Sequence, residues 1–407
     1  AKKAAAALSV ASSNEKDSAL KFAAQMILEN ADEILAANKK DIDEAVINGM
    51  NPSMIDRLTL NQNRLQGIAD GILEVVAQKD PIGEVISGTV RPNGLRVHKV
   101  RVPLGVLGII YESRPNVTAD AAALCIKSGN AVILRGGKEA INSNKAIAAT
   151  LRCALEKAGL PADCVQLVED TSRESAHALM HLNGYLDALI PRGGKGLIRS
   201  VKETATVPVI ETGAGNCHIF IDESANAKMA AEIVFNSKTS RPSVCNAAES
   251  LVIHKNAASR ILPVIKERLD EKDVLLKCDE YSFEILKNTK NVATATDADF
   301  AEEFLDFVIS VKTVENLDEA VEHISKYSTG HTECIVTENY QNANEFTRRI
   351  DSAAVVVNAS TRFTDGGQFG LGCEIGISTQ KLHARGPMGV NELTSCKFIV
   401  YGNGQVR

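Results

Sequence analysis

From residue 102 onward, short apolar runs alternate with segments of helical periodicity, and this alternation constrains the fold more than any other feature of the chain. Such spacing indicates β-α-β units, in which helices bury both faces of a parallel sheet. The runs predict strands at Val106–Ile110, Ala131–Leu134, Val165–Val168, Leu186–Ile190 and Val207–Ile210. The segments near 118–128, 142–158, 172–181 and 195–204 predict the intervening helices.

A second α/β set is expected beyond about residue 230, because the same alternation resumes there. Its predicted strands are Glu249–Ile253, Phe307–Val311, Cys334–Thr337 and Ala353–Val357. The first eighty residues show helical spacing instead, and two more strands are predicted at Leu95–Val102 and Ser395–Val400. A chain of 407 residues exceeds the roughly 250–300 at which one core stops growing, so at least two domains are expected.

Composition and charge exclude several classes of function. The net charge is −6, the pI is about 5.9 and both signs are spread along the chain, which argues against nucleic acid as a partner. No run approaches the roughly 20 apolar residues that a membrane helix needs. The alanine-rich start, Ala1–Val10, lacks the apolar core of a signal peptide. We therefore expect a cytoplasmic protein.

Glycine-rich loops follow three of the predicted strands, where open parallel sheets bind their ligands. They are Arg135-Gly136-Gly137-Lys138, Pro191-Arg192-Gly193-Gly194-Lys195 and Glu211-Thr212-Gly213-Ala214-Gly215. Neither a GxGxxG after the first strand of the α/β region nor a GxxxxGK[ST] motif occurs. Backbone N–H groups in such loops can bind an anion, but an ordinary tight turn with a solvated lysine fits equally well.

One of the nine cysteines, Cys245, lies in a polar loop, whereas most of the others lie in apolar or helical runs. Nearby Arg241 would lower the pKa of a reactive thiol, yet a buried structural thiol remains an equal alternative. Glu211 is either a base or the cap of the next element. His177 and His181 are spaced i, i+4 but have no third ligand in sequence, so no metal site is predicted.

Several motifs, in order along nearly the whole chain, resemble the gamma-glutamyl phosphate reductase family of the aldehyde dehydrogenase superfamily. Val314–Ile335 fits the family's signature throughout. The other matching stretches are Val102–Val106, Tyr111–Asn116, Leu134–Glu139, Arg241–Asn246, Val357–Phe363 and Ile377–Pro387.

The resemblance implies an α/β fold with two three-layer αβα domains, one of them Rossmann-like, plus a small β-flap that builds an oligomer. The implied NADP-binding domain spans residues 1–233 and is interrupted by the flap at 86–102. The implied catalytic domain spans 234–376. Residues 377–407 would return to the first domain and supply the oligomerisation strand.

The resemblance also assigns roles to individual residues. Cys245 aligns with the nucleophile, and Glu211 aligns with the water-activating glutamate of hydrolytic relatives. The cofactor-binding positions are Arg135, Gly136, Gly137, Lys138, Pro191, Arg192, Gly193, Gly194 and Glu303. Of these, Arg135 and Lys138 would suit the 2′-phosphate of NADP, and Glu303 would hold the nicotinamide ribose.

Substrate contacts are implied at Ser113, Arg114, Asn116, Arg241, Asn246, Asn358, Ser360 and Arg362. The three arginines are candidate clamps for the substrate carboxylate, because a planar guanidinium binds carboxylate through two bonds. A surface ion pair or a cofactor contact is the alternative for each of them. Ser113 occupies the position where hydrolytic relatives have an oxyanion-binding asparagine, so the second oxyanion donor stays open.

The implied activity is the NADPH-dependent reduction of L-glutamyl 5-phosphate to L-glutamate 5-semialdehyde with release of phosphate, the second step of proline biosynthesis from glutamate. A thioester on Cys245 would carry the acyl group. The expected partners are the small-molecule substrate, a separate glutamate 5-kinase and further copies of the chain. The alternatives are a hydrolytic NAD(P)-dependent aldehyde dehydrogenase and a catalytically inactive scaffold of the same fold.

Overall fold

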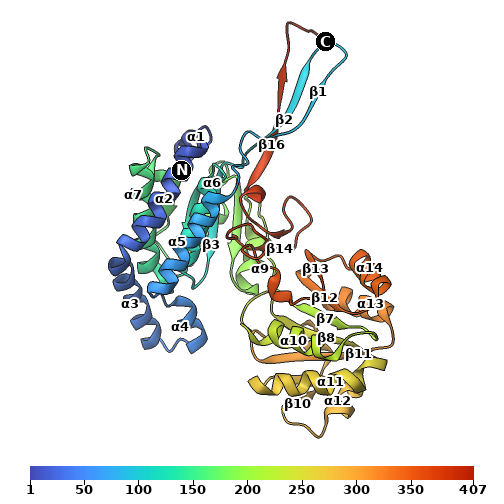
Figure 1. Ribbon diagram of the computed structural model, residues 1–407. Helices are drawn as coiled ribbons and strands as arrows, with labels where there is room; N and C mark the ends of the chain where they lie inside the picture. The colour runs from blue at the N-terminus through green and yellow to red at the C-terminus, as the bar shows by residue number, and fades with distance from the viewer. The chain divides into compact units, whose positions relative to one another are not determined.

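A computed structural model describes residues 1–52 and 54–407 in full and Ser53 by its backbone alone. The chain forms two compact units (Figure 1). Unit 1 contains Ala1–Thr212, Gly370–Gly376 and Pro387–Arg407, and unit 2 contains Gly213–Phe369 and Ile377–Gly386. Among the described helices, none has both the length and the apolar character that crossing a membrane requires.

Unit 1 is built on a four-stranded parallel sheet in the order β5-β4-β3-β6. Its strands are β3 (Val106–Tyr111), β4 (Ala131–Arg135), β5 (Val165–Leu167) and β6 (Ala188–Arg192). All six residues of β3 are buried, as expected for a central parallel strand covered on both faces. The helices are α1 (Lys2–Leu8), α2 (Ser13–Glu29), α3 (Ala31–Ile47), α4 (Pro52–Leu58), α5 (Gln62–Ala77), α6 (Asn116–Lys127), α7 (Ile141–Lys157), α8 (Arg173–Met180) and α9 (Lys195–Thr204).

The first four strands predicted for this sheet are confirmed, and the fifth is not. Val207–Ile210 makes only an isolated bridge, between Leu189 and Val209. Pro208 explains the difference, because proline has no N–H to donate to a strand ladder. Its carbonyl still accepts a bond from the Leu189 N–H at 2.8 Å.

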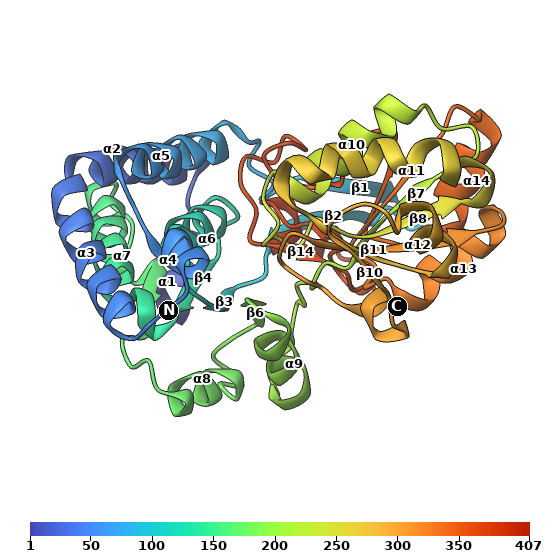
Figure 2. The same cartoon turned by 90° about the horizontal axis from the view of Figure 1, so that it is seen from below.

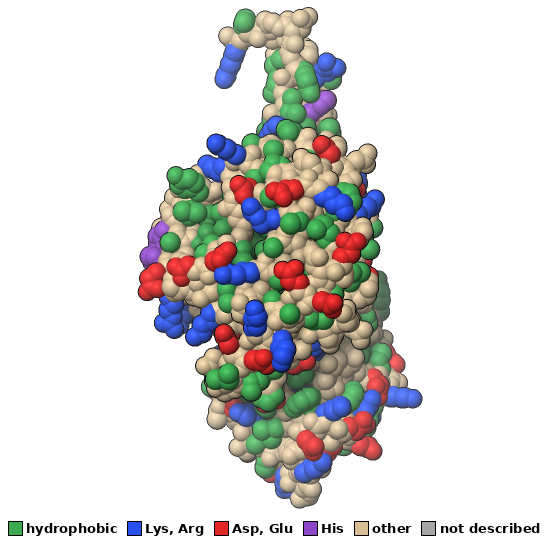
Figure 3. All heavy atoms as spheres, turned by 90° about the vertical axis from the view of Figure 1, so that its left-hand side faces the viewer, with side chains coloured by type: hydrophobic (Ala, Val, Ile, Leu, Met, Phe, Trp, Pro, Cys, Tyr) green, Lys and Arg blue, Asp and Glu red, His purple; other side chains and the backbone are tan. Residues whose placement is uncertain are grey.

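A three-stranded antiparallel flap projects from the body of unit 1 (Figures 1 and 3). It consists of β1 (Val85–Val90), β2 (Arg96–Pro103) and β16 (Thr394–Tyr401), with β2 in the middle. The predicted pairing of the 86–102 region with the C-terminal strand is therefore present. Large apolar side chains are exposed on the flap: Val85, Ile86, Val90, Phe398, Val400 and Tyr401.

Unit 2 is built on a seven-stranded parallel sheet in the order β10-β9-β11-β8-β7-β12-β13. The strands are β7 (Cys217–Ile221), β8 (Ala248–His254), β9 (Leu275–Cys278), β10 (Val292–Thr294), β11 (Val308–Val314), β12 (Thr332–Val336) and β13 (Ala354–Val357). The helices are α10 (Ala227–Thr239), α11 (Lys255–Leu269), α12 (Glu280–Leu286), α13 (Leu317–Tyr327) and α14 (Tyr340–Arg349).

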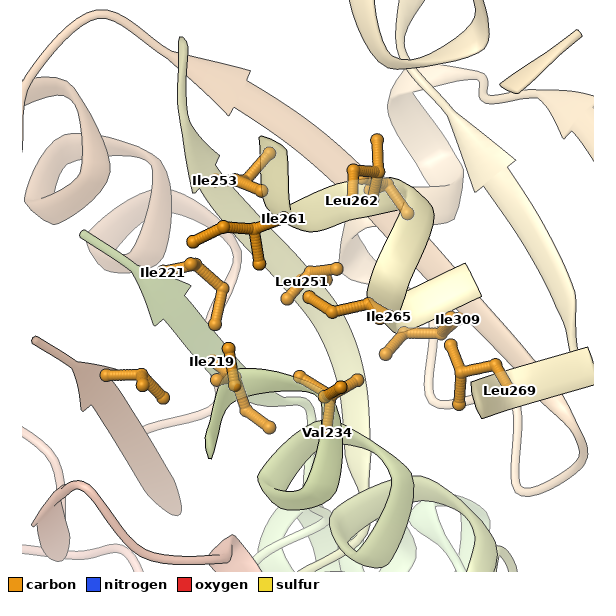
Figure 4. Close-up of a cluster of buried hydrophobic side chains, with 14 of the residues drawn as sticks. Ile219, Ile221, Val234, Leu251, Ile253, Ile261, Leu262, Ile265, Leu269 and Ile309 are labelled. Carbon is orange, nitrogen blue, oxygen red and sulfur yellow. The ribbon is translucent and has the colours of Figure 1, made fainter. Parts of the chain in front are cut away.

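Alternate residues of the central strands of unit 2 face opposite helical layers, as the period of two along a strand requires. Ile219 and Ile221 of β7 and Leu251 of β8 pack with helices α10, α11 and α12 in the core shown in Figure 4. Phe220 and Val252, the residues in between, pack with α13 and α14. Both faces of the sheet are thus buried.

The remaining elements are short. Strands β14 (Ile377–Ser378) and β15 (Gly386–Pro387) form a two-stranded sheet. The 3-10 helices are η1 (Lys138–Ala140), η2 (Ala162–Cys164), η3 (Asp270–Lys272), η4 (Asp297–Ala301), η5 (Thr361–Phe363) and η6 (Asn391–Leu393).

The boundaries of the two compact units differ from the predicted domain boundaries. The predicted boundary between residues 233 and 234 falls inside α10. The break lies between Thr212 and Gly213, because β7 and α10 belong to the sheet and core of unit 2. The predicted C-terminal segment, 377–407, is also divided: 377–386 belong to unit 2 and 387–407 to unit 1.

Candidate active site

The loop that joins α10 to β8 carries Cys245. Helix α10 ends at Thr239 because Arg241 precedes a proline, a position that disfavours helical backbone. The loop enters β8 at Ala248. The Cys245 thiol is partly exposed, so it can meet a small molecule while its backbone is held by the surrounding structure. We call residues 240–247 the nucleophile loop.

Burial makes six of the other thiols poor nucleophiles, and one of them is Cys373, whose pKa it raises well above the ordinary thiol range. It raises the pKa of Cys164 to about 11 and the pKa values of Cys278 and Cys334 to about 12. Burial also raises the pKa values of Cys125 and Cys217, well above the ordinary thiol range. Because the thiolate is the reactive form, these thiols stay inert near neutral pH, as the composition predicted for most of them.

The nucleophile loop is packed backbone to backbone against the segment that leads into β7. A Cβ atom placed on Gly215 would lie 1.4 Å from the carbonyl oxygen of Cys245, so only glycine fits. The Cys217 thiol lies 3.2 Å from the same oxygen. The Gly215 N–H donates to Oε1 of Glu303 at 2.8 Å. Sequence reasoning placed Gly215 in a possible anion-binding turn, and its contact with the nucleophile was missed.

Asn216 holds the backbone of this segment in place through hydrogen bonds. The sequence did not predict this role. Its buried side chain donates to the carbonyl oxygens of Phe300, at 2.9 Å, and Tyr327, at 3.0 Å. Its N–H donates to the Thr329 hydroxyl at 3.1 Å. Glu333 accepts the N–H of His218, two residues further along the chain, at 2.8 Å. Tyr327, Thr329 and Glu333 all belong to the Val314–Ile335 signature, so part of that signature supports the backbone behind Cys245.

Four of the predicted substrate residues lie in or next to the nucleophile loop. Asn246 donates from its side chain to the Thr364 carbonyl at 2.9 Å and accepts a bond from the Arg362 guanidinium. Ser360 hydrogen bonds to the Ser237 hydroxyl at 2.9 Å. Partial burial lowers the pKa of Arg362, and Asp365, Arg241 and Cys245 all act on it electrostatically. Arg241 itself is exposed.

Asn358 lies at the end of a strand. It follows the last residue of β13, and its side chain makes two bonds to the backbone of Thr337, which follows β12, at 2.9 and 2.8 Å. Both positions are at the carboxyl ends of parallel strands, whereas Cys245 precedes the amino end of β8. The Asn358 amide therefore links the carboxyl ends of two neighbouring strands.

In unit 1, the loop after β4 offers donors that fit an anionic ligand. Arg135 donates from Nη2 to the carbonyls of Thr171, at 2.7 Å, and Ser172, at 2.8 Å. Among the described residues, its buried Nε and the buried Nδ2 of Asn144 have no hydrogen-bond partner. Asn144 lies against Gly136, where a Cβ would come within 2.1 Å of Nδ2. Unsatisfied buried donors are rare, so an acceptor-rich ligand beside Gly136 fits this loop.

The second cofactor loop leads from β6 into α9. Pro191 and Arg192 are the last residues of β6, and Gly194 is the N-terminal cap of α9. The Gly194 N–H donates to a Glu112 carboxylate oxygen at 2.9 Å. The start of a helix favours negative charge, so this carboxylate occupies a place that suits an anion.

Two of the predicted substrate residues of unit 1, Ser113 and Asn116, are already engaged in hydrogen bonds. Ser113 has a left-handed backbone (φ 41°), and its N–H and hydroxyl donate to Glu139 at 2.9 and 2.6 Å. Arg114 is partly buried ahead of α6. Asn116 donates to Asp120 at 2.7 Å. Burial raises the pKa of Asp120 to about 6, against the opposing effects of Asn116 and Arg192.

This raised pKa predicts how stability depends on pH. Ionising Asp120 is less favourable in the folded chain than in the unfolded one, so the protein loses stability as the pH rises through about 6. An Asp120→Asn variant avoids this loss. Its free energy of unfolding, relative to the wild type, should rise by on the order of 2 kcal/mol between pH 4 and pH 8. Denaturant titrations at both pH values test this, and a relative gain at acid pH would contradict it.

Glu211 forms an ion pair with Lys202 of α9, at 3.1 Å, and both residues belong to unit 1. The partner is a surface lysine that is 61% exposed, so the contact adds little stability. Glu303 is the other glutamate among the predicted site residues, and one of its carboxylate oxygens accepts the Gly215 N–H. Among the described residues, no group of three or more His, Cys, Asp or Glu side chains could hold a metal ion.

The sequence model of the Aldehyde dehydrogenase family matches residues 1–280 and 289–399 of the chain. A gamma-glutamyl phosphate reductase from Clostridium botulinum is 56% identical, and the match covers 100% of this chain and 98% of the relative. One from Clostridium perfringens is 57% identical and is covered over 97% of its length.

A solved structure shows the same similarity. The crystal structure of a gamma-glutamyl phosphate reductase from Thermotoga maritima has a TM-score of 0.95 and 51% sequence identity. The match covers 100% of this chain and 97% of that one. The likeness therefore extends over the full length of both units.

Proposed function

Because the chain belongs to the aldehyde dehydrogenase family, and within it to the gamma-glutamyl phosphate reductases, we propose that it reduces L-glutamyl 5-phosphate to L-glutamate 5-semialdehyde. The observation that carries this proposal is the full-length similarity to reductases of that name at 56% identity. The partly exposed Cys245 in a firmly held loop supplies a nucleophile for the reaction.

Cys245 begins the reaction. Its thiolate attacks the carbonyl carbon of the acyl phosphate, and the bond from that carbon to the phosphate oxygen breaks, so that phosphate leaves with the electron pair. The acyl group is then held as a thioester. The backbone N–H of Cys245 is a candidate donor to the oxyanion formed in this step.

The nicotinamide cofactor, when bound, supplies the hydride that reduces the thioester carbon. Collapse of the resulting thiohemiacetal anion releases the aldehyde and regenerates the Cys245 thiolate. The leaving group of the first step is phosphate, so no water has to be activated. Glu211, which is ion-paired with Lys202, therefore has no required role in this mechanism.

The basic residues of the first cofactor loop support NADP in preference to NAD. Lys138 is exposed beside the buried glycines Gly136 and Gly137, where it can pair with a 2′-phosphate. We expect Lys138→Ala to raise KM for NADP by about tenfold and to leave KM for NAD nearly unchanged. Steady-state kinetics with both cofactors test this, and an equal rise for both would contradict the assignment.

Arg362 and Arg241 are the substrate clamps that the geometry of unit 2 supports best. Arg362 is tied to Asn246, next to the nucleophile, and Arg241 acts on it electrostatically. Two neighbouring guanidinium groups offer a place for the α-carboxylate of the substrate, which also relieves their mutual repulsion.

Trapping the thioester tests the proposed function. The enzyme is mixed with glutamate 5-semialdehyde and NADP in phosphate-free buffer, quenched in acid and digested. We expect a glutamyl group on the peptide that contains Cys245, and its loss when phosphate is added before the quench. A glutamyl group on another residue, or none while NADPH is formed, would overturn the proposed mechanism.

The flap supports self-association, because exposed apolar residues on a sheet edge are normally covered by another chain. Phe398 and Val400, on one face of β16, are 68% and 55% exposed. We expect the double variant Phe398→Lys with Val400→Lys to shift the protein to monomer in light scattering after size-exclusion chromatography. Lys397→Ala, which directly precedes Phe398 and lies on the other face of the strand, is the control that should keep the oligomer. A double variant of unchanged mass would contradict this role.

The chemistry of the substrate implies where the enzyme works. An acyl phosphate hydrolyses readily and is made by phosphoryl transfer to the glutamate side chain, so we propose that a glutamate 5-kinase supplies it. Because the labile substrate has to be used near the place where it is made, we propose that the enzyme and this kinase work together in the cytoplasm.

A further inference from the structure

A buried ion pair crosses the base of the nucleophile loop. Lys238 lies in the last turn of α10 and Glu249 is the second residue of β8, so the two flank the loop that carries Cys245. Lys238 Nζ lies 2.6 Å from Glu249 Oε2, and both side chains are 0% exposed. Two charges are kept out of water only where their geometry is tightly held, because burial disfavours each of them.

The second oxygen of the same carboxylate holds another segment. Glu249 Oε1 accepts the Leu305 N–H at 3.2 Å. Leu305 has a left-handed backbone (φ 55°), which is unfavourable for a side chain of its size and has to be imposed by its surroundings. Two residues earlier, Glu303 accepts the Gly215 N–H. The carboxylate of Glu249 therefore links the nucleophile loop to the segment that presents Glu303.

Gly215 connects the 303–305 segment to the nucleophile, Cys245. Gly215 is bound by Glu303 on one side and lies against the Cys245 carbonyl on the other. A continuous series of contacts therefore runs from Lys238 to Glu249, then through residues 303–305 and Gly215 to Cys245. All of these residues belong to unit 2.

We propose that Lys238 and Glu249 are positioning residues, which set the backbone of Cys245 for attack and the carboxylate of Glu303 for the cofactor ribose. This inference depends on the roles proposed above for Cys245 and Glu303. Neither Lys238 nor Glu249 needs to touch the substrate, because each acts through the loop that it anchors. The competing explanation is a pair that stabilises the fold and has no effect on the site.

Two double variants separate these explanations. Lys238→Met with Glu249→Gln removes both charges at nearly constant volume and keeps an oxygen for Leu305. Lys238→Met with Glu249→Met removes that acceptor as well. The first readout is the rate at which iodoacetamide alkylates Cys245, followed by peptide mass mapping. The second is KM for NADP, measured in the oxidative direction with semialdehyde and phosphate.

We expect Cys245 alkylation to slow at least fivefold in both double variants, and KM for NADP to rise at least fivefold only in the Met/Met variant. The matched control is Lys266→Met with Asp270→Asn, which removes another ion pair of unit 2 with a buried lysine (2% exposed). It should lower the melting temperature and change neither readout. A well-folded Met/Met variant with both values at wild-type level overturns the proposal.

If the double variants do not fold, the single Glu249→Gln variant takes their place. Burial already lowers the pKa of Lys238, so this lysine can lose its proton when its partner is neutral. Slower Cys245 alkylation in this variant supports the proposal, and an unchanged rate overturns it. If the proposed function itself is wrong, the Cys245→Ala variant would still turn over its substrate. That result is distinct from the results that would overturn the positioning role of Lys238 and Glu249.

Discussion

Replacing Cys245 by alanine is expected to lower turnover by about 10⁴-fold or more, because no other group can form the acyl intermediate. The measurement is NADPH absorbance in the oxidative direction, with circular dichroism to confirm that the variant is folded. Cys153→Ala, on the exposed surface of α7, is the control that should keep wild-type activity. Turnover of Cys245→Ala within an order of magnitude of the wild type would contradict the assignment of the nucleophile.

Gly215→Ala is expected to have the second largest effect. The added Cβ would lie 1.4 Å from the carbonyl oxygen of Cys245. Because this oxygen belongs to the backbone and no side-chain rotation can relieve the clash, the two loops must move apart. We expect at least about 3 kcal/mol of lost unfolding free energy and activity lowered by at least about 10²-fold. Chemical denaturation and steady-state kinetics, measured on the same preparation, test both effects.

Gly71→Ala is the matched control for this substitution. Gly71 lies within α5, and no heavy atom comes within 4 Å of the Cβ position. Alanine should stabilise the helix there by up to about 1 kcal/mol and leave the kinetics unchanged. If Gly215→Ala behaved like this control, the close packing of the two loops would play no part in activity.

Local pattern predicted most of the scaffold. Buried parallel strands are continuous apolar runs, and those at Val106–Ile110 and Ala131–Leu134 were found in the expected sheet. The run Val207–Ile210 misled the prediction because apolar character alone does not reveal the missing N–H of Pro208. Strand β7 was missed because it begins with Cys217 and His218, whose polarity hides a segment that is buried throughout.

Long-range contacts were beyond the sequence. Cys245 could be singled out by its polar loop and by resemblance, but the pair of Lys238 with Glu249 joins two elements that only the fold brings together. The role of Asn216 depends on carbonyl groups that are 84 and 111 residues away along the chain. The bonds of Asn358 to the end of a neighbouring strand were likewise not predicted, and its role toward the substrate stays a prediction.

The signature segment illustrates what a motif records. Tyr327, Thr329 and Glu333 face the chain between Asn216 and His218, and they bond its backbone or the Asn216 side chain. Buried polar groups of this kind are held in place by complete hydrogen bonding, so few other residues fit these positions. In this structure, those signature positions support the backbone segment that packs against the nucleophile loop.

In the oxidative direction, the acyl group should be transferred from Cys245 to phosphate and not to water. The direct test is the oxidative reaction with glutamate 5-semialdehyde and NADP, followed by NADPH absorbance with and without inorganic phosphate. We expect NADPH formation that requires phosphate, rises with the phosphate concentration to saturation and is absent in Cys245→Ala. NADPH formation at the same rate without phosphate would contradict this expectation, and Glu211 would then have to be considered as the base of a hydrolytic aldehyde dehydrogenase.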